Sequence, residues 1–200
     1  GERLGMAAQA AACARVCIEE AAAWAQQRET FGKRLADHQV IRHKIAVMCQ
    51  RVWATTAMLD QLTWRVQNGE QPVAELAMLK VQATETMEFC AREAMQILGG
   101  AGFIRGHRVE RIYREVRVMA IGGGSEEIMR DLAARQLGLW GASGTEIPPV
   151  RLDRTGGAFD DNGHRRNCGF ISAAGRRCMG PLWPASQTLK VFFSPQLAAH

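Results

Sequence analysis

Apolar residues recur at a spacing of three to four positions through the first 139 residues, which predicts a series of amphipathic α-helices. The first covers residues 3–27 and is rich in alanine, the residue with the highest helix propensity. Residues 28–36 interrupt this pattern with a glycine. Asp37 is then a candidate N-cap for a second helix that ends near Asn68.

Glycines mark the ends of the remaining predicted helices. A third helix covers residues 72–98, and the sequence Gly-Gly-Ala-Gly at 99–102 is predicted to break it. A shorter helix over 108–118 follows, and a last one over 125–137 has Ser125 as a good N-cap. Two helices of more than 25 residues with short connections predict an all-α, up-down helical bundle. The glycine clusters match neither a Rossmann fingerprint nor a P-loop.

The pattern is lost from residue 140 onward. Residues 141–200 hold five of the six prolines and eight glycines without usable periodicity. We therefore expect a helical domain over 1–139 and an irregular or disordered tail over 140–200. Cys168, Cys178 and His164 lie in this tail without the paired spacing of structural zinc sites, so no metal site is predicted.

Charge and hydropathy exclude two classes of partner. The net charge is +5, but residues 141–200 contribute +3 of it, so the helical part is nearly balanced and gives no sign of nucleic-acid binding. No run approaches the roughly 20 apolar residues that a membrane span needs.

Six cysteines in 200 residues are too sparse for a disulfide scaffold. Cys13, Cys17, Cys49 and Cys90 lie among apolar neighbours in predicted helices, which favours buried free thiols. Free thiols fit a reducing compartment, so we expect a cytoplasmic protein, or one of the mitochondrial matrix in a eukaryote.

Three segments between or at the ends of helices are candidates for ligand binding: Arg28–Gly32, Gln96–Gly102 and Ile121–Glu127. Consecutive glycines ahead of a capped helix permit close approach of a flat ligand, and helix N-terminal N–H groups suit an anion or a carbonyl oxygen. The arginine side chain is a planar fork of donors suited to phosphate. These features indicate a helical scaffold for a phosphorylated ligand.

The succession R-E-T-F-G, H-Q, Q-I-L-G-G-A-G and I-G-G-G-S-E-E-I-M-R resembles the C-terminal helical domain of the acyl-CoA dehydrogenase family. The resemblance covers residues 1 to about 138. It implies an FAD enzyme that desaturates acyl-CoA thioesters between the α and β carbons, forms homotetramers and passes electrons to an electron-transfer flavoprotein. It also implies an N-terminal helical domain and a middle β-domain outside these 200 residues, so we expect this fragment alone to be inactive.

The resemblance also assigns cofactor contacts. Arg28 resembles the arginine that contacts the FAD pyrophosphate from a neighbouring subunit, and Gln39 the glutamine that contacts the adenosine half. The other residues matching FAD-binding positions are Phe31, Gln96, Ile97, Leu98, Gly99, Gly100, Ser125, Glu126 and Glu127.

The resemblance also implies which residue is the catalytic base. Many family members carry it in a Tyr-Glu-Gly-Thr sequence before the last helix, where this chain has Gly123. The isovaleryl-CoA and long-chain branch instead has the glutamate in an E-R-L sequence, which Glu2-Arg3-Leu4 resembles. Glu2 is thus expected to remove the α-proton. Arg3, Gly123 and Gly124 are expected to bind the substrate.

Other interpretations of the same residues remain open. Glu2 could be an ordinary exposed acid in the first turn of a helix. The domain could be a non-catalytic helical oligomerisation module, or part of an acyl-CoA oxidase that reoxidises its flavin with oxygen.

Overall fold

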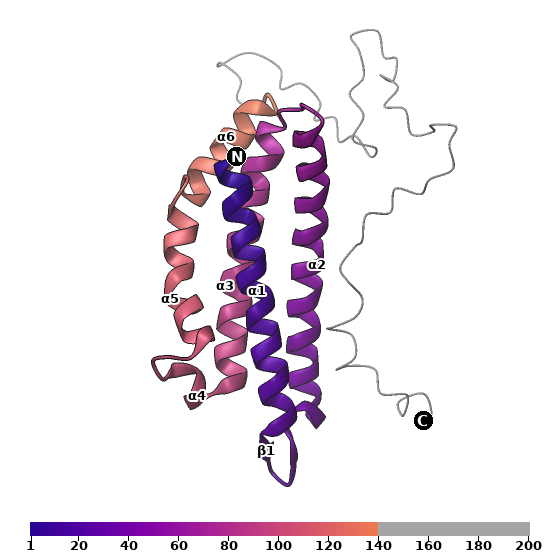
Figure 1. The fold of residues 1–200 in the computed structure, drawn as a ribbon, viewed down its shortest axis with the longest axis vertical. Helices are drawn as coiled ribbons and strands as arrows, with labels where there is room; N and C mark the ends of the chain where they lie inside the picture. Colours follow the sequence, from indigo (N-terminus) through magenta and orange to yellow (C-terminus); the bar gives the residue numbers. More distant parts are fainter. Residues whose placement is uncertain (140–200) are drawn as a thin grey trace, which may run out of the picture. The chain divides into compact units, whose positions relative to one another are not determined.

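Six α-helices make up most of residues 1–139, the part of the chain that the computed structural model describes. The three long helices run alternately up and down, and the shorter ones pack beside them (Figure 1). The predicted all-α, up-down bundle is confirmed. The helices are α1 (Glu2–Gln27), α2 (Gln39–Gln67), α3 (Val73–Leu98), α4 (Gly100–Phe103), α5 (Arg108–Ile121) and α6 (Glu126–Gln136).

Helix α3 lies at the centre of the bundle and packs against α1, α2, α5 and α6. Its tightest partner is the alanine-rich α1, because methyl side chains let two helix backbones approach closely. The small residues with no exposed surface on these two helices are Ala7, Ala10, Ala14, Cys17, Ala21, Ala77, Ala83, Cys90, Ala91 and Ala94.

The four cysteines predicted to be buried thiols are all free. Cys17 and Cys90 are fully buried, whereas Cys13 and Cys49 are only half-buried. Burial raises the pKa of the Cys90 thiol to about 12, and it raises the pKa of Cys17 still further.

The entry into α2 differs from the prediction. Asp37 is not the N-cap. It ends a 3-10 turn (Leu35–Asp37), and His38 holds the cap position of α2. The Asp37 carboxylate instead accepts a hydrogen bond from the Arg34 guanidinium at 3.1 Å, which lowers its pKa. A local ion pair therefore competes successfully with the backbone for this carboxylate.

The glycine break after α3 is shorter than predicted. Only Gly99 leaves the helical conformation, with φ +61°, and residues 100–103 resume it as α4. Gly102 faces α3 so closely that a Cβ on it would lie 2.9 Å from the Leu98 Cβ. The glycine at 102 is thus needed for close packing of α4 against α3.

No helix within residues 1–139 is long and apolar enough to cross a membrane. The predicted tail and the cysteines at 168 and 178 lie outside the described residues.

Candidate functional site

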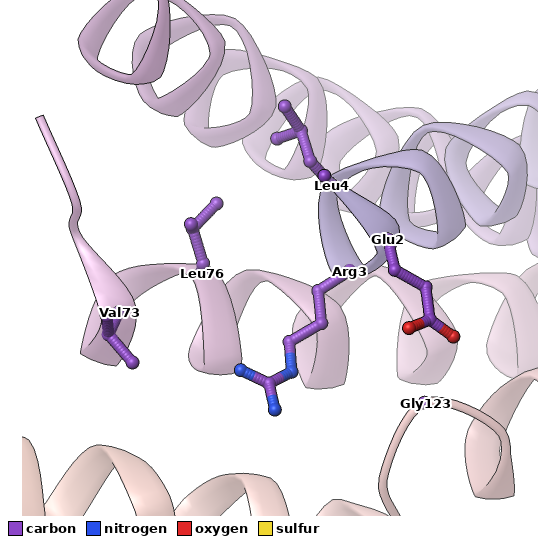
Figure 2. Close-up of a pocket in the computed structure, with 7 residues that line it drawn as sticks. Glu2, Arg3, Leu4, Val73, Leu76 and Gly123 are labelled. Carbon is purple, nitrogen blue, oxygen red and sulfur yellow. The ribbon is translucent and has the colours of Figure 1, made fainter. Parts of the chain in front are cut away.

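An open cleft of about 220 Å³ lies at the end of the bundle where α1 and α3 begin. Glu2 and Arg3 line it on one side, and the loop between α5 and α6 borders it at Gly123 (Figure 2). The remaining lining residues are Gly1, Leu4, Val73 and Leu76, of which three have apolar side chains. A carboxylate, a guanidinium and an apolar wall therefore share one cleft.

The structure brings Glu2 and Gly123 together, although 120 residues separate them in sequence. A Cβ built on Gly123 would lie 3.9 Å from Glu2 Oε1 and 2.5 Å from Met6 Sδ. The Glu2 carboxylate points toward the Gly123 loop in Figure 2. A side chain at either position would thus enter the same space, and here Glu2 and Met6 occupy it.

Gly123 and Gly124 also have backbone conformations that favour glycine. Their φ angles are +67° and +113°, in the region that residues with a Cβ rarely adopt. A Cβ on Gly124 would collide with the Met129 side chain. The methionine side chains thus pack directly against the bare backbone of the loop.

Replacing Gly123 by alanine should lower the free energy of unfolding by about 1–3 kcal/mol, because it combines a positive φ with a contact on Met6. Truncating Met6 in the Gly123→Ala variant should recover only the stability lost through the clash with Met6, and not the part lost through the positive φ. Gly5→Ala is the matched control: its Cβ meets open space in α1, so we expect a gain of about 0.5–1 kcal/mol. Urea unfolding followed by far-UV circular dichroism measures all three. Equal stabilities for the two alanine variants would contradict the prediction.

A residue that sequence reasoning missed supports the same loop. Lys80, in the middle of α3, has no exposed surface. Its ammonium donates hydrogen bonds to the backbone oxygens of Ala120 at 2.6 Å and Gly124 at 2.7 Å. Burial lowers the pKa of Lys80, and the nearby Glu126 partly opposes this. The sequence held a sign of this burial, because Lys80 falls between Ala77 and Ala83 on the apolar face of the helix.

Helix α6 begins where the sequence predicts, but the predicted capping hydrogen bond is not formed. Ser125 is its N-cap residue, yet its hydroxyl makes no hydrogen bond to a backbone N–H. The pKa of the Glu127 carboxyl is lowered, first by its own backbone N–H and then by the Ser125 side chain. Glu126 pairs with Arg130 one turn further on.

A second group of predicted residues lies at the opposite end of the bundle, where α1 and α3 end and α2 begins (Figure 1). Arg28 precedes a short hairpin of β1 (Glu29–Thr30) and β2 (Lys33–Arg34). Phe31 at its tip is 97% exposed and has a φ of +53°, a strained backbone conformation for an aromatic residue. Gln39 is exposed at the first residue of α2.

The C-terminal end of α3 contributes to this second group unevenly. Gln96, Gly99 and Gly100 are exposed, and a Cβ on either glycine would meet nothing within 4 Å. Ile97 and Leu98 have their side chains buried in the core. A ligand here would therefore meet the backbone of these two residues and not their side chains.

The two ends of the bundle are too far apart to form one small site in a single chain. The 26 residues of α1 span roughly 39 Å at about 1.5 Å per residue. Glu2, Arg3, Gly123, Gly124 and the start of α6 lie at one end. Arg28, Phe31, Gln39 and the end of α3 lie at the other.

Residues 1–138 match the family model described as acyl-CoA dehydrogenase, C-terminal domain. The chain is 39% identical over 145 residues to acyl-CoA dehydrogenase AFT10-1 of Alternaria alternata, covering 67% of this chain and 34% of that protein. It is 36% identical over 129 residues to the caffeyl-CoA reductase-Etf complex subunit CarC of Acetobacterium woodii, covering 64% of this chain and 34% of that protein.

The fold is also similar to that of solved structures from the same family. A probable acyl-CoA dehydrogenase of Mycobacterium abscessus superposes with a TM-score of 0.67 at 42% identity, covering 68% of this chain and 36% of that one. The chain thus spans about a third of the length of the proteins it matches. Because the family model covers more than two thirds of the 200 residues, the chain belongs to the acyl-CoA dehydrogenase family.

Proposed function

We propose that this chain acts in the FAD-dependent α,β-dehydrogenation of acyl-CoA thioesters, as the C-terminal part of the enzyme. The observation that carries the proposal is the position of Glu2, whose carboxylate shares a cleft with Arg3 and faces the bare backbone of Gly123. Family members that carry the base in the loop before the last helix would place it at Gly123. This chain has its carboxylate within 3.9 Å of where that side chain would begin.

Glu2 is proposed as the general base that removes the α-proton of the substrate. Hydrogen bonds to the thioester carbonyl make this proton more acidic, because they stabilise the negative charge that develops on the oxygen. Arg3 lies next to Glu2 in the cleft and is proposed to contact the thioester end of the substrate. Gly123 and Gly124 are proposed to border the substrate through their backbone, because Met6 and Met129 fill the space beside their Cα atoms.

The residues at the two ends of the bundle fit FAD chemically. Arg28 is an exposed guanidinium for the pyrophosphate, and Gln39 and Gln96 are exposed amides for hydroxyl and ring groups. The open space beside Gly99 and Gly100 admits a flat ligand against the backbone. Ser125, Glu126 and Glu127 are proposed to contact the flavin at the cleft end. When bound, the flavin supplies the acceptor for the hydride that leaves the β carbon.

The distance between these ends supports a homo-oligomer, which we propose to be a tetramer. An FAD molecule is much shorter than the roughly 39 Å of α1. The cleft end of one copy and the hairpin end of another are therefore proposed to hold the same cofactor. Helix α2 also exposes large apolar side chains that a second copy would cover, among them Trp53 at 61% and Trp64 at 52%.

An electron-transfer flavoprotein is the proposed electron acceptor. The Acetobacterium woodii relative is by name a subunit of a complex with Etf. The competing proposals differ in the fate of the flavin. An acyl-CoA oxidase would pass the electrons of the reduced flavin to oxygen and form hydrogen peroxide, whereas a non-catalytic module would show no reduction by substrate.

A hybrid enzyme tests this function directly. Residues 1–139 replace the matching C-terminal part of the Alternaria alternata dehydrogenase, which supplies the rest of the enzyme. We expect the purified hybrid to retain FAD after desalting and its visible flavin absorption to bleach anaerobically with butyryl-CoA or isovaleryl-CoA. Peroxide formation in air at the rate of turnover would favour the oxidase. A folded hybrid that binds FAD but is bleached by no acyl-CoA would contradict the proposal.

A further inference from the structure

Lys80 carries a positive charge in a part of the bundle whose other buried residues are mostly apolar. Its side chain has no exposed surface, and both of its hydrogen bonds go to backbone carbonyl oxygens. Burying a charge is costly unless strong hydrogen bonds compensate for it. The Lys80 side chain is therefore held in place by its two hydrogen bonds to these carbonyls.

The two carbonyls stand on either side of the loop between α5 and α6. Ala120 lies in the last turn of α5, where carbonyls have no partner within the helix and the helix dipole is negative. Gly124 directly precedes Ser125, the N-cap of α6. One ammonium thus ties the end of α5 to the start of α6.

The glycine loop that follows α5 has little rigidity of its own. It consists of Gly122, Gly123 and Gly124, and glycine loses more conformational freedom on ordering than any other residue. Gly122 still donates to the Val118 carbonyl at 2.8 Å, as a continuation of α5. The following two glycines have positive φ angles, and Gly123 lines the Glu2 cleft.

We propose that Lys80 is a positioning residue. It holds the Gly122–Gly124 loop against Glu2 and so fixes the position of the proposed base relative to the substrate. The role of Glu2 in this inference rests on the proposed function. The two hydrogen bonds by which Lys80 holds the loop, called the clamp below, do not depend on that function. Lys80 is not among the residues that line the Glu2 cleft. It acts through the backbone oxygens at both ends of the loop.

The clamp is tested by NMR on the 200-residue chain without substrate. In the unmodified chain we expect scalar couplings across hydrogen bonds from Lys80 Nζ to the carbonyl carbons of Ala120 and Gly124. Absence of both couplings would overturn the proposal. This measurement needs no variant, so it decides the matter even if a substitution at Lys80 prevents folding.

The Lys80→Met variant keeps a long side chain but removes the donors. We expect the backbone order parameters of Gly123 and Gly124 to fall from about 0.85 to below about 0.6, with helix content unchanged. Lys44→Met is the matched control, because Lys44 pairs with Glu93 between α2 and α3 and has no contact with the loop. A loop that stays equally ordered in Lys80→Met would refute the clamp.

Kinetics in the hybrid enzyme separate positioning from plain stability. Lys80→Met should lower kcat about tenfold or more with little change in KM, and the isotope effect of an α-deuterated substrate should rise. A merely structural loss would reduce the amount of active enzyme and leave that isotope effect unchanged. If the unmodified hybrid itself is inactive, the proposed function fails, while the NMR couplings still decide whether Lys80 holds the loop.

Discussion

Glu2→Gln should slow reduction of the flavin by acyl-CoA about 10²- to 10⁴-fold in the hybrid enzyme. Glutamine has nearly the shape of glutamate, so the cleft shared with Arg3 and Gly123 is kept, but the amide cannot accept the α-proton. Stopped-flow bleaching of the flavin under anaerobic conditions measures this step. The amount of bound FAD should stay the same, because Glu2 is assigned to the substrate and not to the cofactor.

Glu19→Gln is the matched control for this experiment. Glu19 lies on the same helix, is exposed and is far from the cleft, so its loss should leave the rate unchanged. If Glu2→Gln is reduced as fast as the unmodified enzyme, another group is the base. The proposed role of Glu2 would then have to be abandoned, although membership of the family would stand.

Raising the pH from about 9 to about 11 should cost the chain about 5 kcal/mol of stability, through the buried thiols of Cys17 and Cys90. In the unfolded chain these thiols ionise near pH 9.0, whereas burial raises the pKa of Cys90 to about 12 and that of Cys17 further. The unfolded chain therefore binds fewer protons over this interval. Stability then falls by about 1.4 kcal/mol per pH unit for each thiol. The loss is comparable with the whole stability of many domains.

Urea unfolding at a series of pH values tests this slope. The double variant Cys17→Ala, Cys90→Ala should be less stable near neutral pH, because it leaves small cavities, but much less sensitive to pH above 9. Lys80 acts in the opposite direction, since its pKa is lowered on folding and stability rises as it loses its proton. If stability is flat between pH 9 and 11 in the unmodified chain, the thiols do not ionise on unfolding as we expect.

Helix existence and order were predictable from the sequence because they depend on local information. Alanine content and apolar spacing predict α1, α2 and α3, and glycines mark the ends of α3 and α5. The resemblance of the E-R-L and I-G-G-G sequences to the family's motifs also singled out Glu2 and Gly123 as related positions. The misjudged details are those in which two local interactions compete, as at Asp37, where the Arg34 guanidinium holds the carboxylate that was expected to cap α2.

Other features depended on the tertiary structure. Periodicity shows which face of α3 is buried, but not that Lys80 on this face meets two carbonyls of a loop 40 residues away. It also leaves open that Ile97 and Leu98 turn into the core while Gln96 stays exposed. The sequence alone thus determined a helical bundle with a carboxylate and a glycine loop as candidates for one site. Only the packing of α1 against α3 and α5 decided that Glu2, Met6 and Gly123 occupy the same space, because contacts between distant segments depend on how helix faces fit together and not on spacing within any one of them.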